Sequence, residues 1–261
     1  MTLYYIKTNL VNATSLPDNT FVNGNEDTVY TVDKMYNKRP SYPFRFDGVD
    51  AQWAKARWLA AAQQITFLGI FNHNLLETVA ITLNGDVADG AFADLVSTPV
   101  WRAGNMYALF DGTWKWWKLN INNGAATIAQ LGELVLGNWA SFSNAYVQPG
   151  RADGPVIHAT RSTTYYGQDW TAYLSKGEAF SIALKNINDP DATDDIHAFL
   201  NDVWENNDGK FVFIPDHERP QVYYVQVVNT DKYARRTING VKELREWKLE
   251  LKTLTDGITL L

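Results

Sequence analysis

Residues Ile65–Asp86, ITFLGIFNHNLLETVAITLNGD, decide the fold class of this chain. The first seven residues form an almost unbroken apolar run, which predicts a buried strand. From Val79 to Leu83 apolar and polar residues alternate, which predicts a strand with one buried face. The stretch closes on Asn84-Gly85, a pair that we interpret as a turn. Two strands joined by a polar connection therefore indicate a β-rich fold.

The connection between these strands is Asn72-His73-Asn74. Asparagine side chains hydrogen-bond to nearby backbone and tolerate left-handed conformations. We therefore interpret the triplet as a tight turn whose polar groups are satisfied internally. A ligand-binding role for Asn72, His73 and Asn74 stays open as the alternative.

A tryptophan-rich segment follows at residues 111–124, DGTWKWWKLNINNG. If it is one strand, Trp114 and Trp116 share one face and Trp117 takes the other. We favour core or interface for these rings because large aromatic side chains are mostly buried, and keep Trp114 and Trp116 as candidates for sugar stacking. In residues 131–137, LGELVLG, the glycines at 132 and 137 predict bends between short strands. Short strands with Gly and Asn turns suggest a sandwich or jelly roll.

The first 60 residues are rich in polar and turn-forming residues, and we expect loops with one or two short strands there. The Ala-rich stretch AKARWLAAAQQ, residues 54–64, has helical propensity. The strand-like ITFLGIF follows it directly, so a short helix and an extended segment both stay open.

Residues 148–155, QPGRADGP, carry two prolines and two glycines and are the predicted domain boundary. Domains of residues 1–147 and 148–261 result. The second contains several strand patterns and one predicted helix near residues 193–206, with Thr193 as N-cap. Its apolar positions follow helical spacing: Ile196, Phe199, Leu200 and Val203.

The composition excludes several function classes. The chain has 261 residues, a net charge of −6, a pI near 5.2 and no cysteine. No basic groove for nucleic-acid recognition, thiolate site, signal peptide or membrane span is predicted. The four histidines are far apart in sequence, and no nucleophile or phosphate-binding motif occurs. We therefore expect no catalytic residues, no metal and no cofactor.

Two groups of acidic residues are candidates for catalysis or for metal binding. The carboxylate pairs 194/195, 26/27 and 243/246 do not stand out as a glycosidase pair. The aspartates at 86, 89 and 94 could hold Ca²⁺, although a solvated loop is the default interpretation.

The order of motifs resembles a known family. The segments YNKRPSYPFRF, ITFLGIFNHNLLETVAITLNG and WKWWKLNINNGAATIAQLGELVLG resemble a discoidin-like, galactose-binding-type jelly roll found in structural proteins of tailed bacteriophages. This resemblance covers about residues 25–142. The second half, with its predicted helix followed by FVFIPD, is similar to the β domain of phage tail-tube and distal-tail (baseplate) proteins.

The resemblance implies a mainly β protein with an N-terminal jelly-roll β-sandwich. A C-terminal β-sandwich or barrel with one flanking α-helix would follow it. The implied function is a structural component of a phage tail, made in the host cytoplasm and located in the virion. Its partners would be copies of itself in a threefold or sixfold ring, and other tail proteins. Trp170, Tyr173, Tyr223 and Tyr224 are the interface candidates.

Two other functions were considered. A carbohydrate-binding module, or a receptor-binding protein attached to a virion, would take a host-surface glycan. An enzyme such as a depolymerase would need a carboxylate pair, and none is favoured.

Overall fold

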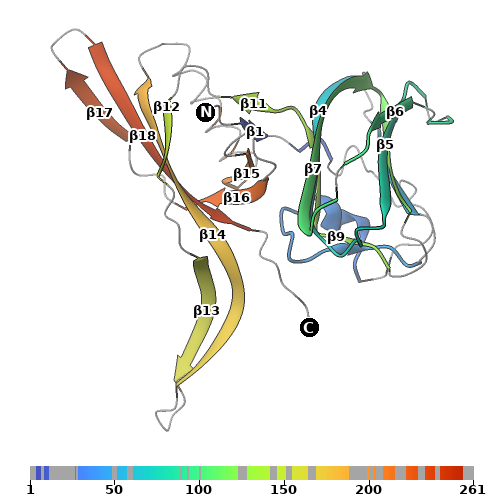
Figure 1. Cartoon of the computed structure of the whole chain (residues 1–261), viewed down its shortest axis with the longest axis horizontal. Helices are drawn as coiled ribbons and strands as arrows, with labels where there is room; N and C mark the ends of the chain where they lie inside the picture. The colour runs from blue at the N-terminus through green and yellow to red at the C-terminus, as the bar shows by residue number, and fades with distance from the viewer. Residues whose placement is uncertain are drawn as a thin grey trace. The chain divides into compact units, whose positions relative to one another are not determined.

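The computed structural model describes residues 4–6, 9–11, 27, 29–48, 52–57, 61–88, 90–92, 94–99, 101–122, 128–141, 146–150, 155–163, 169–187, 199, 203, 208–214, 222–228, 233–238 and 242–254. The chain packs as two units, one of residues Tyr5–Ala140 and one of Met1–Tyr4 with Ser141–Leu261. Strands β1 (Tyr4–Ile6) and β11 (Ala140–Ser141) each contain a point of division. Both units are drawn in Figure 1, and each is described by itself below.

The unit Tyr5–Ala140, called here the sandwich unit, has two main antiparallel sheets that face each other (Figure 1). The first sheet has the order β3-β8-β5-β6, with β3 (Gln52–Arg57), β8 (Trp116–Asn122), β5 (Ala80–Asp86) and β6 (Asp94–Ser97). The second has the order β10-β4-β7, with β10 (Glu133–Gly137), β4 (Gln63–His73) and β7 (Gly104–Trp114). Most successive strands change from one sheet to the other, as in a jelly roll, whereas β5 and β6 pair within the first sheet. The 3-10 helix η2 (Val32–Tyr36) and the short pair β2 (Phe44–Arg45) and β9 (Gln130–Leu131) complete the unit.

One apolar core lies between the two sheets. The first sheet contributes Ile81, Leu83 and Leu119, and the second contributes Leu68 and Ile70, all at most 3% exposed. Alternate residues of the first sheet supply these contacts, since successive side chains of a strand point to opposite faces. The mainly β fold class that the sequence predicts is confirmed.

The predicted turn at Asn84-Gly85 is wrong. Both residues lie inside β5, opposite Lys118 and Trp117 of β8, and the strand continues to Asp86. A Cβ on Gly85 would lie 2.4 Å from the Trp114 ring. The glycine is therefore needed for close packing of a ring against the strand and not for a turn.

The Ala-rich stretch begins in extended conformation. Residues Gln52–Arg57 form β3, which pairs with β8 from Gln52↔Ile121 to Arg57↔Trp116. Of the two alternatives for this segment, the extended one is observed where the structure describes it. Packing against β8 outweighs the intrinsic helical preference of alanine.

The second unit has one open antiparallel sheet in its described part, without closure into a barrel. Its path runs β15-β16-β18-β14-β12, with β17 on β18 and β13 on β14. The bounds are β12 (Tyr146–Gly150), β13 (Pro155–Thr163), β14 (Asp169–Ile187), β15 (Lys210–Ile214), β16 (Tyr223–Val227), β17 (Tyr233–Ile238) and β18 (Lys242–Thr253). β14 pairs with β13 along its first half and with β12 and β18 along its second half.

The helix predicted near residues 193–206 lies mostly outside the described residues. Of its positions the structure describes Phe199 and Val203, which are helical and at most 1% exposed. The Phe199 ring lies 5.1 Å from that of Phe211 in β15, centre to centre. The Gly209 amide, at φ +74°, donates to the Val203 carbonyl, an arrangement typical of a helix C-terminus.

The predicted boundary at residues 148–155 differs from the observed division. Residues 148–150 belong to β12, which pairs with β14 inside the second unit, and the division falls between Ala140 and Ser141. The identities predicted for the two domains stay predictions. In the described part of the chain, no helix has the length and apolar character needed to cross a membrane.

Candidate ligand-binding face

The outward face of the first sheet carries a regular array of polar and aromatic side chains. Strand register places these residues in three rows: Trp53–Asn120–Thr82, Lys55–Lys118–Asn84 and Arg57–Trp116–Asp86. We call these nine residues the polar sheet face. They are half-buried, apart from Trp116, which is 9% exposed. The alternate residues of the same strands form the core, and strand period separates the two faces except at Trp116, which also belongs to the buried cluster.

Aromatic rings hold the cations of this face. The Lys55 ammonium lies 5.2 Å from the Trp53 ring centre and 5.5 Å from that of Trp116. The Lys118 ammonium lies 5.0 Å from Trp53, and the Arg57 guanidinium carbon lies 5.2 Å from Trp116. Contacts at this range are cation–π interactions. They restrict the directions of three long side chains.

An amide and hydroxyl network lies beside the cations. The Asn120 side-chain NH₂ donates to the Asn84 side-chain oxygen at 2.9 Å and to the Thr82 hydroxyl at 3.3 Å. The Thr82 hydroxyl in turn donates to the Asn84 oxygen at 3.1 Å. Within the described residues, the Asn120 oxygen and the Asn84 NH₂ make no hydrogen bond. The network therefore presents one acceptor and one donor group to a ligand.

Asp86, the carboxylate of the face, is engaged by its own loop. Its oxygens accept hydrogen bonds from the Ala88 amide at 3.2 Å and from the Phe92 amide at 3.1 Å. These bonds lower the pKa of Asp86, the one from Ala88 most. The loop is thus ordered by side-chain capping of backbone N–H groups.

The calcium site considered from the sequence would combine Asp86 with the aspartates at 89 and 94. Residue 89 and the side chain at 94 lie outside the described part of the structure. Among the described side chains there is no group of three or more potential metal ligands.

The turn predicted at Asn72–Asn74 is wrong in part: Asn72 and His73 lie in β4, whose register shifts between Phe71 and His73, and His73 lies opposite Gly104 of β7. We keep the name Asn72–Asn74 turn for this bulged end of the strand. Asn72 is left-handed, with φ +50°, and its NH₂ donates to the Pro40 carbonyl at 2.7 Å. The Asn74 side chain donates to the Ile128 carbonyl at 2.9 Å and accepts from the Gln130 amide at 2.8 Å. These bonds join the turn to segments up to 56 residues away in sequence, and agree with the structural interpretation.

His73 is also engaged by the backbone. Its Nδ1 accepts a hydrogen bond from the Leu75 amide at 3.2 Å, so the neutral ring carries its proton on Nε2. Burial lowers the pKa of His73 to about 4, while the Arg102 backbone has a smaller opposite effect. The His73 residue as a whole is half-buried, and its Nε2 has no hydrogen-bond partner among the described residues. A neutral imidazole there suits a structural position.

Gly132 completes the turn from the other side. Its amide donates to the Phe71 and Asn72 carbonyls, at 2.9 and 3.1 Å. A Cβ at this position would lie 2.3 Å from the Pro40 carbonyl oxygen. The bend predicted at Gly132 is therefore a close approach of three backbone segments.

The expectation that Trp114 and Trp116 share a face is wrong. β7 ends at Trp114 and β8 begins at Trp116, with a bend at Lys115 between them. Trp114 packs against Gly85 at the edge of the core, whereas Trp116 lies on the polar sheet face. Trp117 is 1% exposed and belongs to the core, as predicted.

The four interface candidates of the second unit have different positions. The side chains of Trp170 and Tyr173 lie outside the described part, and β14 places these residues opposite Ser162 and Ala159. Tyr223 is half-buried in β16. Tyr224 is 4% exposed, so its ring contributes to packing inside the structure more than to an outer surface.

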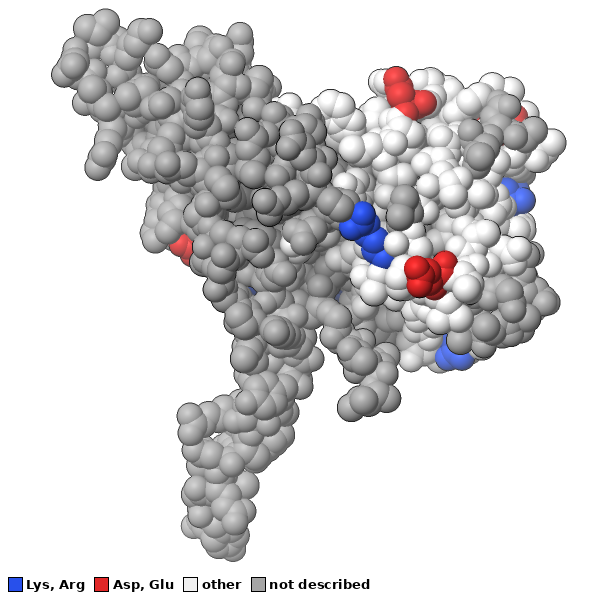
Figure 2. Space-filling view, viewed as in Figure 1, with Lys and Arg blue, Asp and Glu red and all other residues white. Residues whose placement is uncertain are grey.

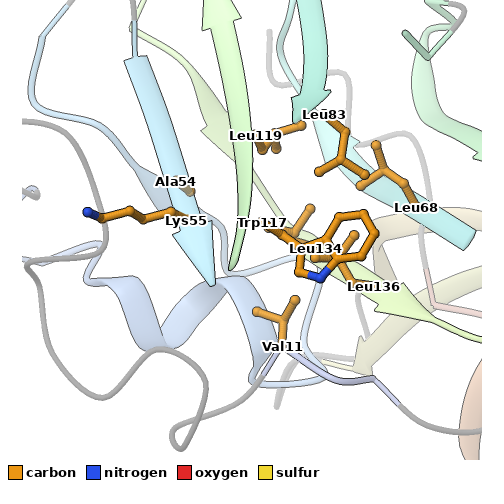
Figure 3. A pocket seen from close by; sticks show the side chains of 9 residues that line it. All are labelled: Val11, Ala54, Lys55, Leu68, Leu83, Trp117, Leu119, Leu134 and Leu136. Carbon is orange, nitrogen blue, oxygen red and sulfur yellow. The ribbon is translucent and has the colours of Figure 1, made fainter. Parts of the chain in front are cut away.

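The cavity in Figure 3 is part of the core and not a ligand pocket. It has a volume of about 10 Å³, roughly the space of one water molecule. Leucine side chains and Trp117 line it, and Figure 3 shows the Lys55 side chain pointing away. A sugar ring does not fit there.

The surface charges are otherwise dispersed. Figure 2 shows basic and acidic side chains separated over the described part of the sandwich unit in that view. Lys55 and Lys118, directly opposite each other in register, are the exception to this dispersion.

Sequence reasoning missed Trp53, Lys55, Arg57 and Lys118. A signal for the first three was present, because WAKAR alternates large or charged residues with alanine at the period of a strand. Because alanine also favours helices, this strand pattern did not exclude a helix at the same residues. No local sequence pattern predicts that Lys55 pairs with Lys118, because the two residues are 63 positions apart in the chain (118 − 55).

Comparisons with known proteins identify no family. No family model matches the chain, and no curated protein matches it. The chain is similar to solved structures of chitosan-binding module 1 from a Paenibacillus sp. IK-5 chitosanase/glucanase, at 16% identity and a TM-score of 0.38. That match covers 45% of this chain and 92% of the module.

Two further solved structures are similar to the chain at comparable TM-scores. A selenomethionine-labelled mutant of that module matches at 16% identity and a TM-score of 0.37, covering 45% of this chain and 91% of the mutant. A Ruminococcus gnavus fucosidase in complex with fucose matches at 10% identity and a TM-score of 0.38, covering 49% of this chain and 27% of the fucosidase. Two of these three solved structures are thus of a chitosan-binding module.

The fold and the face together define a class: a β-sandwich unit with a polar and aromatic face on one sheet, followed by a second β unit.

Proposed function

We propose that the sandwich unit is a carbohydrate-binding module that takes a polysaccharide on the polar sheet face. The observation that carries this proposal is the placement of ring, amide and hydroxyl groups in register on one outward sheet face. Carbohydrates present apolar C–H faces and many hydroxyls. Aromatic surfaces and side-chain amides complement both.

Different side chains of the face would make the apolar and the polar contacts with such a ligand. The partly exposed Trp53 ring is the stacking surface, and the Asn84–Asn120–Thr82 network supplies hydrogen bonds. Because the network and the cations are already ordered, little rotamer freedom is lost on binding. Binding, and not turnover, is the proposed activity.

Affinity electrophoresis of the full chain through a panel of soluble polysaccharides tests this proposal. Trp53→Ala and Asn120→Ala should each abolish retardation by a polysaccharide that retards the parent chain. Tyr42→Ala is the matched control, because Tyr42 is 44% exposed and lies away from the face, 6.0 Å from Tyr30 between ring centres. Loss of binding in the Tyr42 variant alone would move the site to that tyrosine pair, and no retardation on any polysaccharide would refute the proposal.

We propose assembly into a phage tail as the second function. One observation favours it: residues Asp169–Glu178 of β14 pair with β13 alone among the described strands. A two-stranded ribbon has open edges with which a second copy can pair. Electron microscopy of the purified chain should show rings. A monodisperse monomer at high protein concentration would count against this function.

A further inference from the structure

We infer that the polar sheet face binds the interior of an extended polysaccharide chain, over about three sugar units that cross β3, β8 and β5. The chain would follow the row Trp53–Asn120–Thr82, which strand register places side by side. This inference rests on the proposed carbohydrate-binding function and names the form of its ligand. A single sugar and a chain end are the two ligand forms that it excludes.

The groups that can contact a ligand are spread over three strands. The half-buried Trp53 ring belongs to β3, the Asn120 side-chain oxygen to β8 and the Asn84 NH₂ to β5. A ring offers a stacking surface, and the two amide groups offer one acceptor and one donor to hydroxyl groups. Lys55 and Arg57 are engaged by groups of the protein itself, so we assign them no ligand contact.

The distance between these groups sets the length of the ligand. Adjacent strands of a sheet are about 5 Å apart, so β3 and β5 are about 10 Å apart across β8. One sugar ring is too short to reach from the Trp53 ring to the Asn84 amide. A chain of sugar rings laid across the strands reaches both, because each ring of an extended chain advances by about one strand spacing.

Within the described residues, no strand closes either end of the row. β3 is an end strand of the first sheet, so no described strand of that sheet lies beyond Trp53. At the other end, β6 stops at Ser97, opposite Leu83, so no described strand pairs with Thr82 on its outer side. A polysaccharide can therefore continue past both ends of the row, whereas a site for a chain end needs a wall at one of them.

The two sides of the face differ in a way that places the ligand. On one side, Asp86 holds its loop through the amides of Ala88 and Phe92. On the other side, Asn122 of β8 lies opposite Ala80 of β5, and both residues are exposed. The short Ala80 side chain leaves space above the sheet, and the Asn122 amide adds a donor and an acceptor. We therefore expect the ligand on the side of the face that carries these two residues.

A size series of oligosaccharides tests the inference. Affinity electrophoresis first shows which of mixed-linkage β-glucan, arabinoxylan, glucomannan and alginate retards the full chain. Calorimetry then measures the binding of that polymer's oligosaccharides, from the monosaccharide to the hexasaccharide. The affinity should rise at least about tenfold between the monosaccharide and the trisaccharide, and change by no more than about twofold beyond the tetrasaccharide. Equal affinity for the monosaccharide and the hexasaccharide would overturn the inference and leave the carbohydrate function standing.

Reduction of the hexasaccharide with borohydride separates binding to the chain interior from binding to the reducing end. The reaction opens the sugar ring at the reducing end and leaves the other rings intact. The affinity should stay within about twofold of that for the unreduced sugar. A loss of about tenfold would show that the chain end is held, and would overturn the inference. On the long polymer, each chain should bind more protein molecules than its two ends can hold.

Variants along the row locate the ligand. Trp53→Ala, Asn84→Ala and Asn122→Ala should each lower the affinity for the trisaccharide at least about fivefold. Asn138→Ala is the matched control and should leave it unchanged, because Asn138 is an exposed amide that follows β10 of the second sheet. Circular dichroism establishes that each variant is folded. Unchanged trisaccharide binding by the folded Asn84 and Asn122 variants would overturn the inference, and no retardation by any polysaccharide of the panel would refute both proposals.

Discussion

The sandwich unit contains two polar clusters that differ in what their polar groups do. In the Asn72–Asn74 turn, side chains bind backbone atoms of distant segments, as in the 2.7 Å bond from Asn72 to Pro40. On the polar sheet face, apart from Asp86, side chains contact other side chains, as in the bond from Asn120 to Asn84. The turn connects distant segments of the sandwich unit, and the face presents its side chains outward.

This difference separates stability from binding. A polar group whose partner is backbone cannot be removed without leaving a buried donor or acceptor unsatisfied. A side-chain cluster on an outer face can be replaced while the backbone stays hydrogen-bonded in its sheet. We therefore expect changes in the turn to alter stability, and changes on the face to alter binding.

The largest loss of stability is expected from a substitution at Gly132, where the backbone of the turn is most crowded. Gly132→Ala would place a Cβ 2.3 Å from the Pro40 oxygen and 2.8 Å from the Phe71 oxygen. Both are backbone atoms that cannot rotate away, so we expect a loss of about 3 kcal/mol in the free energy of unfolding. Urea denaturation measures it.

Gly48→Ala is the matched control for this substitution. Its Cβ would meet the end of the Gln52 side chain at 3.2 Å, and a change of about 0.5 kcal/mol is expected. If the two variants lose the same stability, the crowding at Gly132 does not matter and the turn is not a closed structural element.

An intermediate effect is expected from the protonation of His73. Its pKa is lowered to about 4 by burial, against 6.5 for an ordinary histidine. Because the unfolded chain takes up the proton at higher pH than the folded one, this contribution is complete above pH 6.5. It is lost as the pH falls toward 4, and amounts to about 2 kcal/mol because the residue is only partly buried.

Urea unfolding of the parent and of His73→Asn, followed between neutral pH and pH 4, checks this contribution. Asparagine offers an acceptor to the Leu75 amide but does not titrate. The stability advantage of the parent should shrink as the pH falls. Parallel pH profiles would show that His73 is not buried as a neutral ring, and the turn would then resemble a functional site more closely.

The smallest effect on stability is expected on the polar sheet face. Lys55→Gln removes cation–π contacts but also the like charge opposite Lys118. The two changes oppose each other, so the free energy of unfolding should change by no more than about 0.5 kcal/mol at low salt. A loss as large as that of Gly132→Ala would make the face a structural part of the fold and remove the contrast with the turn.

Local sequence patterns predicted much of the sandwich unit. The apolar run before Asn72 is β4, the alternation after Val79 is β5, and Gly132 lies between β9 and β10. Each of these features depends on hydrophobic period or on backbone geometry, which are properties of a few neighbouring residues.

Other features depend on partners far away in the sequence. Gly85 resembles a turn residue, but the Trp114 ring packs against it and keeps it inside β5. Trp114 and Trp116 are two residues apart, yet a bend between β7 and β8 separates their faces. Neither the ring contact nor the bend can be read from the neighbouring residues.

The sequence by itself determined that this protein is mainly β, lacks cysteine chemistry and has a polar turn between two core strands. Those properties follow from composition and from the period of the strands. Only the tertiary structure decided which residues share a surface. Strand pairing brings Trp53 beside Asn120 and Lys55 beside Lys118. Register is a relation between segments, and it is set by how the whole sheet packs against its core.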